Sequence, residues 1–220
     1  MAKPFVRAKS RLGEVPADRR RQLTAAMLHD TLDAVRPVAA SVVVVSDEPR
    51  LPELLVEWGH PRVSVVPDPG RGLNAAVVAP DALLGVAPYP RPRLALVADL
   101  PCLRTEEFAA VAAAAAEVPA CFVADAEGTG TTMLGSVLGP LQPRFGQDSA
   151  DRHRAAGAVR LVGDWPGARH DVDTPADIDA AARIGVGPAT RAVLDAPPPL
   201  GDRRGTARGA RNDPGPSTSA

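Results

Sequence analysis

Cysteine is scarce in this chain of 220 residues, which has only Cys102 and Cys121. The two lie far apart and match no metal-binding or redox spacing, so we expect both in the core of a protein from a reducing compartment. Long apolar runs are lacking too: no stretch approaches the ~20 residues that a membrane-spanning helix needs. The N-terminus has no signal-peptide core. These absences predict a cytoplasmic protein without a membrane segment.

Lysine is equally scarce, being present only at Lys3 and Lys9, and the formal net charge is −1. A nearly neutral chain lacks the basic balance of a broad nucleic-acid surface, so we expect no nucleic-acid partner. The G-x-G-x-x-G signature, the P-loop and the G-x-S-x-G elbow are also absent. Several common classes of α/β enzyme are thereby excluded.

Strand-length apolar runs alternate with helical segments, which predicts an α/β fold with a mostly parallel sheet. The expected strands are 40–47, 63–68, 93–99, 120–125, 132–137 and 168–173. The expected helices are 17–35, 50–58, 72–85, 105–117, 148–156 and 175–184. Residues 1–194 are expected to form one domain. Residues 195–220 are too rich in Pro, Gly and Arg to form a core and are predicted to be a disordered tail.

Several predicted strands end in aspartate, and ligands of open parallel sheets bind outside the carboxyl ends of the strands. Asp99 is the best of these candidates, because it ends the most apolar strand and Pro101 turns the chain away directly afterwards. The alternative is an Asp that only accepts hydrogen bonds from loop amides.

The stretch "HDVDTPADI" contains a helix start. Thr174, Pro175 and Asp177 suit the N-cap, N1 and N3 positions of a helix that Gly185 ends. Asp171 and Asp173 are then not needed for capping. Residues two apart in an extended strand share a face, so this acidic pair could hold Mg²⁺, although a solvated acidic turn is about as plausible.

Two stretches suit a phosphate group. In "GTGTTML", Gly128 and Gly130 allow a tight turn that could present amides and the Thr131 hydroxyl to an anion. In "PRFGQDSADRHR", Gly146 precedes Ser149 at the start of a short helix, whose free amides could bind an anion. An ordinary turn and a well-capped surface helix are the alternatives.

The remaining candidates are charged or imidazole side chains. Lys3, Arg7, Lys9 and Arg11 cluster before the first helix, where they could neutralise a triphosphate or simply be solvated. The four histidines share no metal-binding or catalytic spacing, and His29 lies in an apolar-patterned helix where packing is the simpler role.

Seven stretches in order resemble the guanylyltransferases of deazaflavin coenzyme F-420 biosynthesis, most of all the actinobacterial phosphoenolpyruvate enzymes. They are "KPFVRAKSRL", "AMLHDTL", "DPGRGLNAAV", "VADLPCL", "FVADAEGTGTTML", "PRFGQDSADRHRAAGA" and "HDVDTPADI". The resemblance runs to about residue 190. It implies a three-layer α/β/α nucleotidyltransferase fold, Rossmann-like and glycosyltransferase-A-like. The implied reaction transfers GMP from GTP to the phosphate of a small phosphorylated acid and releases pyrophosphate.

The resemblance also assigns roles to residues. It implies that Asp99, Asp171 and Asp173 bind the catalytic metal, Mg²⁺, and that Thr131, Gly146 and Ser149 contact the acceptor. Lys9 and Arg11 are expected at the triphosphate and Asn74 at GTP. The expected partners are GTP and the acid, with handover of the unstable product to the next pathway enzyme.

The chain departs from the family at its start. Members usually open with an apolar strand before the "K-P" segment, whereas this sequence begins at Met1-Ala2-Lys3-Pro4. We expect that the first strand is missing through a misplaced start or a truncation. The acceptor remains open among phosphoenolpyruvate, 2-phospho-L-lactate and 3-phosphoglycerate. Another nucleotidyltransferase of this architecture, or a non-catalytic GTP-binding relative, is the rival interpretation.

Overall fold

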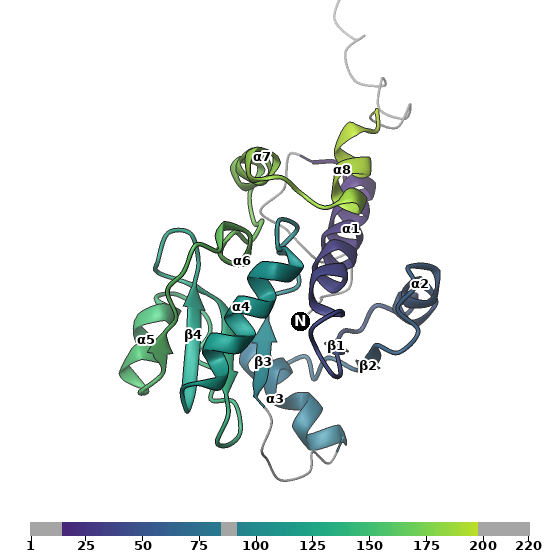
Figure 1. Cartoon of the computed structure of the whole chain (residues 1–220). Helices are drawn as coiled ribbons and strands as arrows, with labels where there is room; N and C mark the ends of the chain where they lie inside the picture. The colour runs from purple at the N-terminus through teal and green to yellow at the C-terminus, as the bar shows by residue number, and fades with distance from the viewer. Residues whose placement is uncertain (1–14, 85–91, 198–220) are drawn as a thin grey trace, which may run out of the picture.

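A computed structural model describes residues 15–84 and 92–197 (Figure 1). The helices are α1 (Ala17–Val35), α2 (Leu51–Glu57), α3 (Leu73–Leu84), α4 (Thr105–Ala116), α5 (Ser149–Ala155), α6 (Pro166–Arg169), α7 (Pro175–Ile184) and α8 (Pro188–Asp195). The strands are β1 (Val43–Val45), β2 (Ser64–Val66), β3 (Arg93–Leu96), β4 (Ala120–Ala124), β5 (Thr131–Ser136) and β6 (Val159–Arg160). No helix in these ranges is both long and apolar enough to cross a membrane.

The described strands form two sheets. β1 and β2 pair in parallel, while the larger sheet has the order β3-β5-β4-β6. In the larger sheet β5 runs antiparallel to both β3 and β4, and β4 is parallel to β6. The prediction of a mostly parallel sheet is therefore wrong, and the sheet is mixed. The physical reason is the connection: residues 125–130 are too few for the crossover that a parallel pair requires.

The larger sheet is covered on both faces. On one face, Val123 and Met133 pack with Phe108 and Val111 of α4. On the other, Phe122 and Leu134 pack against Phe145 and Ala150, with side chains of α3 at the margin. Adjacent residues of a strand thus pack into cores on opposite faces of the sheet, because successive side chains of a strand point to opposite faces. The described part of the chain accordingly has helices on either side of the sheet (Figure 1).

Each of the six predicted helices is present among the described residues, with ends displaced by at most one residue, and the helices expected over 17–35 and 175–184 are α1 and α7 themselves. The strand expected over 168–173 is absent: α6 occupies Pro166–Arg169 and the chain then runs on without strand pairing. α6, α8 and β6 were not predicted from the sequence. All but the first three residues of the predicted 195–220 tail lie outside the described residues.

α8 is held against α1 by a buried carboxylate. Asp30, which is 4% exposed, accepts hydrogen bonds from the amides of Ala189 (2.9 Å) and Thr190 (2.8 Å). These are orphan donors of the α8 N-terminus, so Asp30 caps a helix that begins about 160 residues later in the chain. Gly187 permits the approach, because a Cβ there would lie 2.4 Å from Asp30 Cγ.

Candidate functional site

The candidate site lies at one edge of the larger sheet. β3 and β4 are both antiparallel to β5, so their carboxyl ends meet the start of β5 at the same edge. The backbone continues this pairing beyond β3, where the amide of Val97 donates to the carbonyl of Thr132 at 3.0 Å. Asp99 and Thr131, which are distant in sequence, are therefore brought to the same edge.

The segment of residues 171–173 after α6, here called the acidic stretch, joins that edge through one backbone hydrogen bond. The amide of Val172 donates to the carbonyl of Asp99 at 3.2 Å. Val172 is buried at 1% exposure, while Asp171 and Asp173 on either side of it are partly exposed. The expected strand is absent, but the alternation of burial is that of extended backbone, and it sets both carboxylates opposite Val172.

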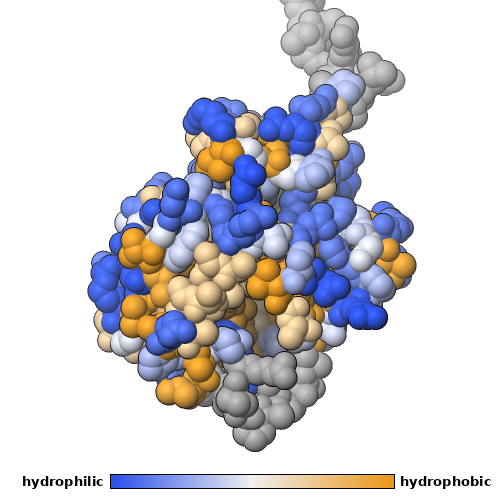
Figure 2. Space-filling model, viewed as in Figure 1, coloured by the Kyte–Doolittle hydropathy of each residue, from blue (hydrophilic) through white to orange (hydrophobic). Residues whose placement is uncertain are grey.

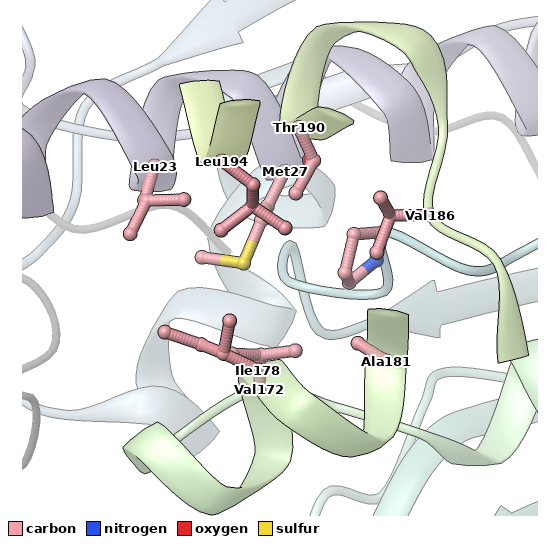
Figure 3. A pocket seen from close by; sticks show the side chains of 9 residues that line it. Leu23, Met27, Val172, Ile178, Ala181, Val186, Thr190 and Leu194 are labelled. Atoms are coloured by element: carbon pink, nitrogen blue, oxygen red, sulfur yellow. The ribbon is translucent and has the colours of Figure 1, made fainter. Parts of the chain in front are cut away.

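Apolar packing holds the acidic stretch from behind. Val172 lines a small cavity with Leu23 and Met27 of α1, Ile178 of α7 and Leu194 of α8 (Figure 3). Its volume of about 10 Å³ is room for at most one water molecule. It is thus a packing gap beneath the acids, and no nucleotide could enter it.

The helix cap beside the acids is the predicted one. Thr174 is the N-cap of α7, and its hydroxyl accepts from the amide of Asp177 at 3.3 Å. The Asp177 carboxylate accepts from the amides of Asp173 (3.0 Å) and Thr174 (2.7 Å). Burial acts to raise the pKa of Asp177, but the hydrogen bonds from Thr174 and Asp173 outweigh it and lower that pKa. Capping is done by Thr174 and Asp177, as the sequence predicted.

α6 positions the start of the acidic stretch. The Thr132 hydroxyl of β5 donates to the carbonyl of Ala168 at 2.7 Å, and the buried Glu107 of α4 accepts from the amide of Gly167 at 3.0 Å. A Cβ on Gly167 would lie 2.1 Å from the carbonyl oxygen of Cys102, so only glycine allows this approach. These contacts join elements far apart in the chain, so they have no local sequence signal.

The three predicted metal ligands offer only carboxylate oxygens, which is the donor set that Mg²⁺ prefers. Asp99, Asp171 and Asp173 are each partly exposed, so an ion could reach them from solvent. Asp99, Asp171 and Asp173 do not form a set of three ligand atoms within 4.8 Å of one another; within the described residues, His29, Asp33 and His60 form such a set. The three aspartates thus match Mg²⁺ in residue type, and their assignment as its ligands stays a prediction.

Thr131, Ser149 and His153 form a buried polar cluster at the start of β5. The Thr131 hydroxyl accepts from Ser149 Oγ at 3.2 Å and lies 2.9 Å from His153 Nδ1. His153 Nε2 accepts from the Arg144 amide at 2.9 Å, so the ring proton of the neutral form resides on Nδ1 and is donated to Thr131. Burial, helped by the charges of Arg144 and Arg152, lowers the pKa of His153 to about 4. His153 is thus a neutral orienting group that the sequence spacing did not reveal.

The glycine turn before β5 does not present its amides to an anion. The amides of Gly128 (2.6 Å), Thr129 (3.0 Å) and Gly130 (2.8 Å) all donate to the carboxylate of Asp125. The expectation that these amides bind a substrate anion is therefore wrong, because the chain's own Asp125 carboxylate occupies the turn; the expected role of the Thr131 hydroxyl is a separate matter. An Asp ahead of a glycine-rich turn is a known signal for this arrangement.

Gly146 lies in an exposed loop that Asn74 holds in place. The Asn74 side chain accepts from the amide of Phe145 at 2.7 Å and donates to its carbonyl at 3.3 Å. Gly146 has φ +120°, a conformation that side chains rarely adopt. Asn74 thus has a positioning role in this structure, and its contact with GTP stays a prediction.

The start of α5 has no side-chain cap: its N-cap residue is Asp148, in a left-handed conformation. Lys9 and Arg11, expected at the triphosphate, lie outside the described residues.

The surface in Figure 2 is hollowed below its centre, near where β3 and α3 lie in Figure 1, and apolar side chains gather around the hollow.

The fold is shared with a solved structure. The structure is similar to that of a candidate nucleotide-diphospho-sugar transferase from Desulfovibrio desulfuricans G20, with a TM-score of 0.64 and 20% identity. The match covers 86% of this chain and 87% of that one. The match shows that the two chains share a mixed α/β fold.

The chain belongs to the family described as guanylyl transferase CofC like, whose pattern matches residues 2–153. Proteins named phosphoenolpyruvate guanylyltransferase are similar over most of their length. That of Geodermatophilus obscurus is 44% identical, covering 88% of this chain and 91% of its own. That of Salinispora arenicola is 43% identical, covering 89% and 92%, and that of Streptomyces coelicolor is 45% identical, covering 87% and 92%. The family predicted from the sequence is confirmed.

Proposed function

We propose that this protein is a guanylyltransferase that transfers GMP from GTP to phosphoenolpyruvate and releases pyrophosphate. The product would be enolpyruvoyl-diphospho-guanosine, an intermediate of coenzyme F-420 biosynthesis. The observation that carries the proposal is the similarity of nearly the whole chain to relatives bearing the name of this activity, at 40 to 45% identity. The edge that gathers Asp99, Thr131 and the acidic stretch supports it, because its carboxylates could hold a cation between two anionic substrates.

We assign the carboxylates of Asp99, Asp171 and Asp173 to Mg²⁺ binding. When bound, Mg²⁺ would supply positive charge to offset the repulsion between the two phosphates and the charge of the departing pyrophosphate. The protein's part is to hold these carboxylates at the sheet edge, through the Val172 amide that donates to the Asp99 carbonyl. The cap of α7 fixes the chain on the other side of Asp173.

The acceptor's phosphate is assigned to Thr131, Gly146 and Ser149. The Thr131 oxygen accepts from Ser149 and from His153 in the neutral form described above, which leaves its own proton to donate to a phosphate oxygen. The exposed loop at Gly146 is held by Asn74. The acceptor phosphate is already ionised at neutral pH, so the reaction needs no protein base.

The test is to incubate the full chain with GTP, Mg²⁺ and one of phosphoenolpyruvate, 2-phospho-L-lactate or 3-phosphoglycerate, and to identify the product by mass. We expect a nucleotide product from phosphoenolpyruvate together with pyrophosphate. Asp171→Asn should abolish turnover while retaining the thermal stability of the parent. A preference for either other acid would reassign the substrate, and a parent that binds GTP without turnover would identify a non-catalytic relative.

A further inference from the structure

A second cluster of potential metal ligands lies on α1, away from the site described above. His29 and Asp33 are four residues apart on one face of the helix, and His60 follows α2. Asp33 lies between the two imidazoles: its Oδ2 is 3.7 Å from His29 Nε2 and its Oδ1 is 3.2 Å from His60 Nε2. Ligand atoms of all three lie within 4.8 Å of one another.

His60 is the residue that points to a ligand. Its side chain is 7% exposed, and its Nε2 is buried without a hydrogen bond among the described residues. The 3.2 Å contact with Asp33 therefore lacks the alignment of a hydrogen bond. A buried ring nitrogen that faces a carboxylate and a second imidazole, but bonds to neither, suits a metal ion between them.

The surroundings hold the imidazoles in place. The ring of Trp58 stacks on His29, with centroids 4.7 Å apart and planes 9° apart, and His60 meets His29 edge-on at 5.6 Å. The charge of Arg36 acts on His60 and would oppose a cation, which the carboxylate of Asp33 offsets.

The cluster faces away from the candidate catalytic edge. Thr31 on α1 accepts from the amide of Leu100, next to Asp99, at 3.2 Å. His29 and Asp33 are two residues before and after Thr31, so both lie about 160° around the helix from it. Asp33 is 51% exposed and His29 23%, which leaves a route from solvent.

We propose that His29, Asp33 and His60 form a transition-metal site that binds Zn²⁺ through two imidazoles and one carboxylate, with a fourth position left to water. Two nitrogens and one oxygen suit Zn²⁺ and not Mg²⁺, which prefers oxygen ligands throughout. Ligand atoms on a tetrahedral Zn²⁺ are separated by roughly 3.3 Å, so side-chain movements that shorten the separations by at most about 1.5 Å would close the set. The bound ion would tie α1 to the segment that follows α2.

The cysteines do not compete for the ion. Cys102 is 2% exposed and Cys121 1%, so Zn²⁺ in solvent does not reach either thiol while the chain is folded. Zn²⁺ binding to the folded chain can therefore be assigned by imidazole and carboxylate variants alone.

The test is calorimetric titration of ZnCl₂ into the untagged, metal-free full chain, with Trp fluorescence as a second readout because Trp58 stacks on His29. We expect one Zn²⁺ per chain, a rise in melting temperature with Zn²⁺, and no displacement by millimolar Mg²⁺. His29→Gln and Asp33→Asn, which alter partly exposed side chains, should each weaken binding more than about tenfold.

Asp171→Asn is the matched control and should bind Zn²⁺ like the parent, which separates this site from the carboxylates assigned to Mg²⁺. His60→Gln should also lose binding, and its melting temperature without Zn²⁺ reports whether the variant is folded. Absence of binding to the parent, unchanged affinity in both His29→Gln and Asp33→Asn, or loss of binding in Asp171→Asn would each overturn the proposal. None of these outcomes depends on guanylyl transfer.

Discussion

At the scale of single residues, the site depends on hydroxyl and imidazole groups whose protons are fixed by their neighbours. Thr131 is 7% exposed, Ser149 2% and His153 1%. Such buried polar groups are tolerated only when they are hydrogen-bonded, and here Ser149 and His153 both form hydrogen bonds with the Thr131 hydroxyl. Among these three side chains, the Thr131 hydroxyl is the one left to donate to a substrate phosphate.

Replacing Thr131 by Val should therefore raise the KM for phosphoenolpyruvate by roughly tenfold, since one hydrogen bond to a charged group is lost. The KM for GTP should change little, and Thr131→Ser should restore most of the loss. Steady-state kinetics with each substrate varied in turn would measure both constants. Ser136→Ala, at the far end of the same strand, is the control and should behave like the parent. Equal effects of Thr131→Val on both KM values would contradict the acceptor role.

At the scale of elements, the start of α7 decides where the acidic stretch ends. Asp177 accepts three hydrogen bonds, from the amides of Asp173 and Thr174 and from the Thr174 hydroxyl. A helix start satisfied in this way stops the chain from fraying next to the acids.

Asp177→Ala should lower the free energy of unfolding by about 1 kcal/mol at pH 7, as is typical for loss of a cap. The pKa of Asp177 is lowered from 3.8 in the folded chain, so its carboxylate stabilises the fold above pH 3.8 and this contribution is lost as the pH falls through the folded pKa. The difference between parent and variant should therefore shrink below pH 3.8. Urea unfolding at pH 7 and pH 3 measures it, with the exposed Asp179→Ala on the same helix as control. A constant difference at both pH values would contradict the charged role.

At the scale of the whole molecule, the acidic stretch rests on a core drawn from both ends of the described chain. Leu23 and Met27 of α1 pack with Cys102, Val172 and Ala181. Asp30 adds a polar tie between α1 and α8. The position of Asp171 and Asp173 is thus a property of tertiary packing.

Val172→Ala should lower the free energy of unfolding by about 1 to 3 kcal/mol, because it enlarges a cavity in this core. It should also reduce kcat, since the stretch carrying Asp171 and Asp173 loses its anchor. Denaturant unfolding and turnover at saturating substrate measure the two effects. Val159→Ala, at a position 45% exposed, is the control and should change neither. Full activity in Val172→Ala would show that backbone hydrogen bonds alone position the acids.

The sequence by itself determined the family, the alternation of strands and helices, and the start and end of α7. These features are local, because hydrophobic periodicity, helix caps and helix-ending glycines depend on residues only a few positions apart in the sequence. It also identified Asp99, Asp171, Asp173, Thr131, Gly146 and Ser149 as the residues to examine, through the resemblance and through their places after strands and turns.

Only the tertiary structure decided which groups meet. The mixed sheet follows from strand pairing, the glycine turn is filled by Asp125, and His153 faces Thr131 because α5 packs on β4. His60 meets Asp33 across the gap between α1 and the segment after α2, although nothing in their spacing suggests a metal site. Such contacts join residues far apart in the chain, and long-range packing, unlike a cap or a turn, has no local sequence signal.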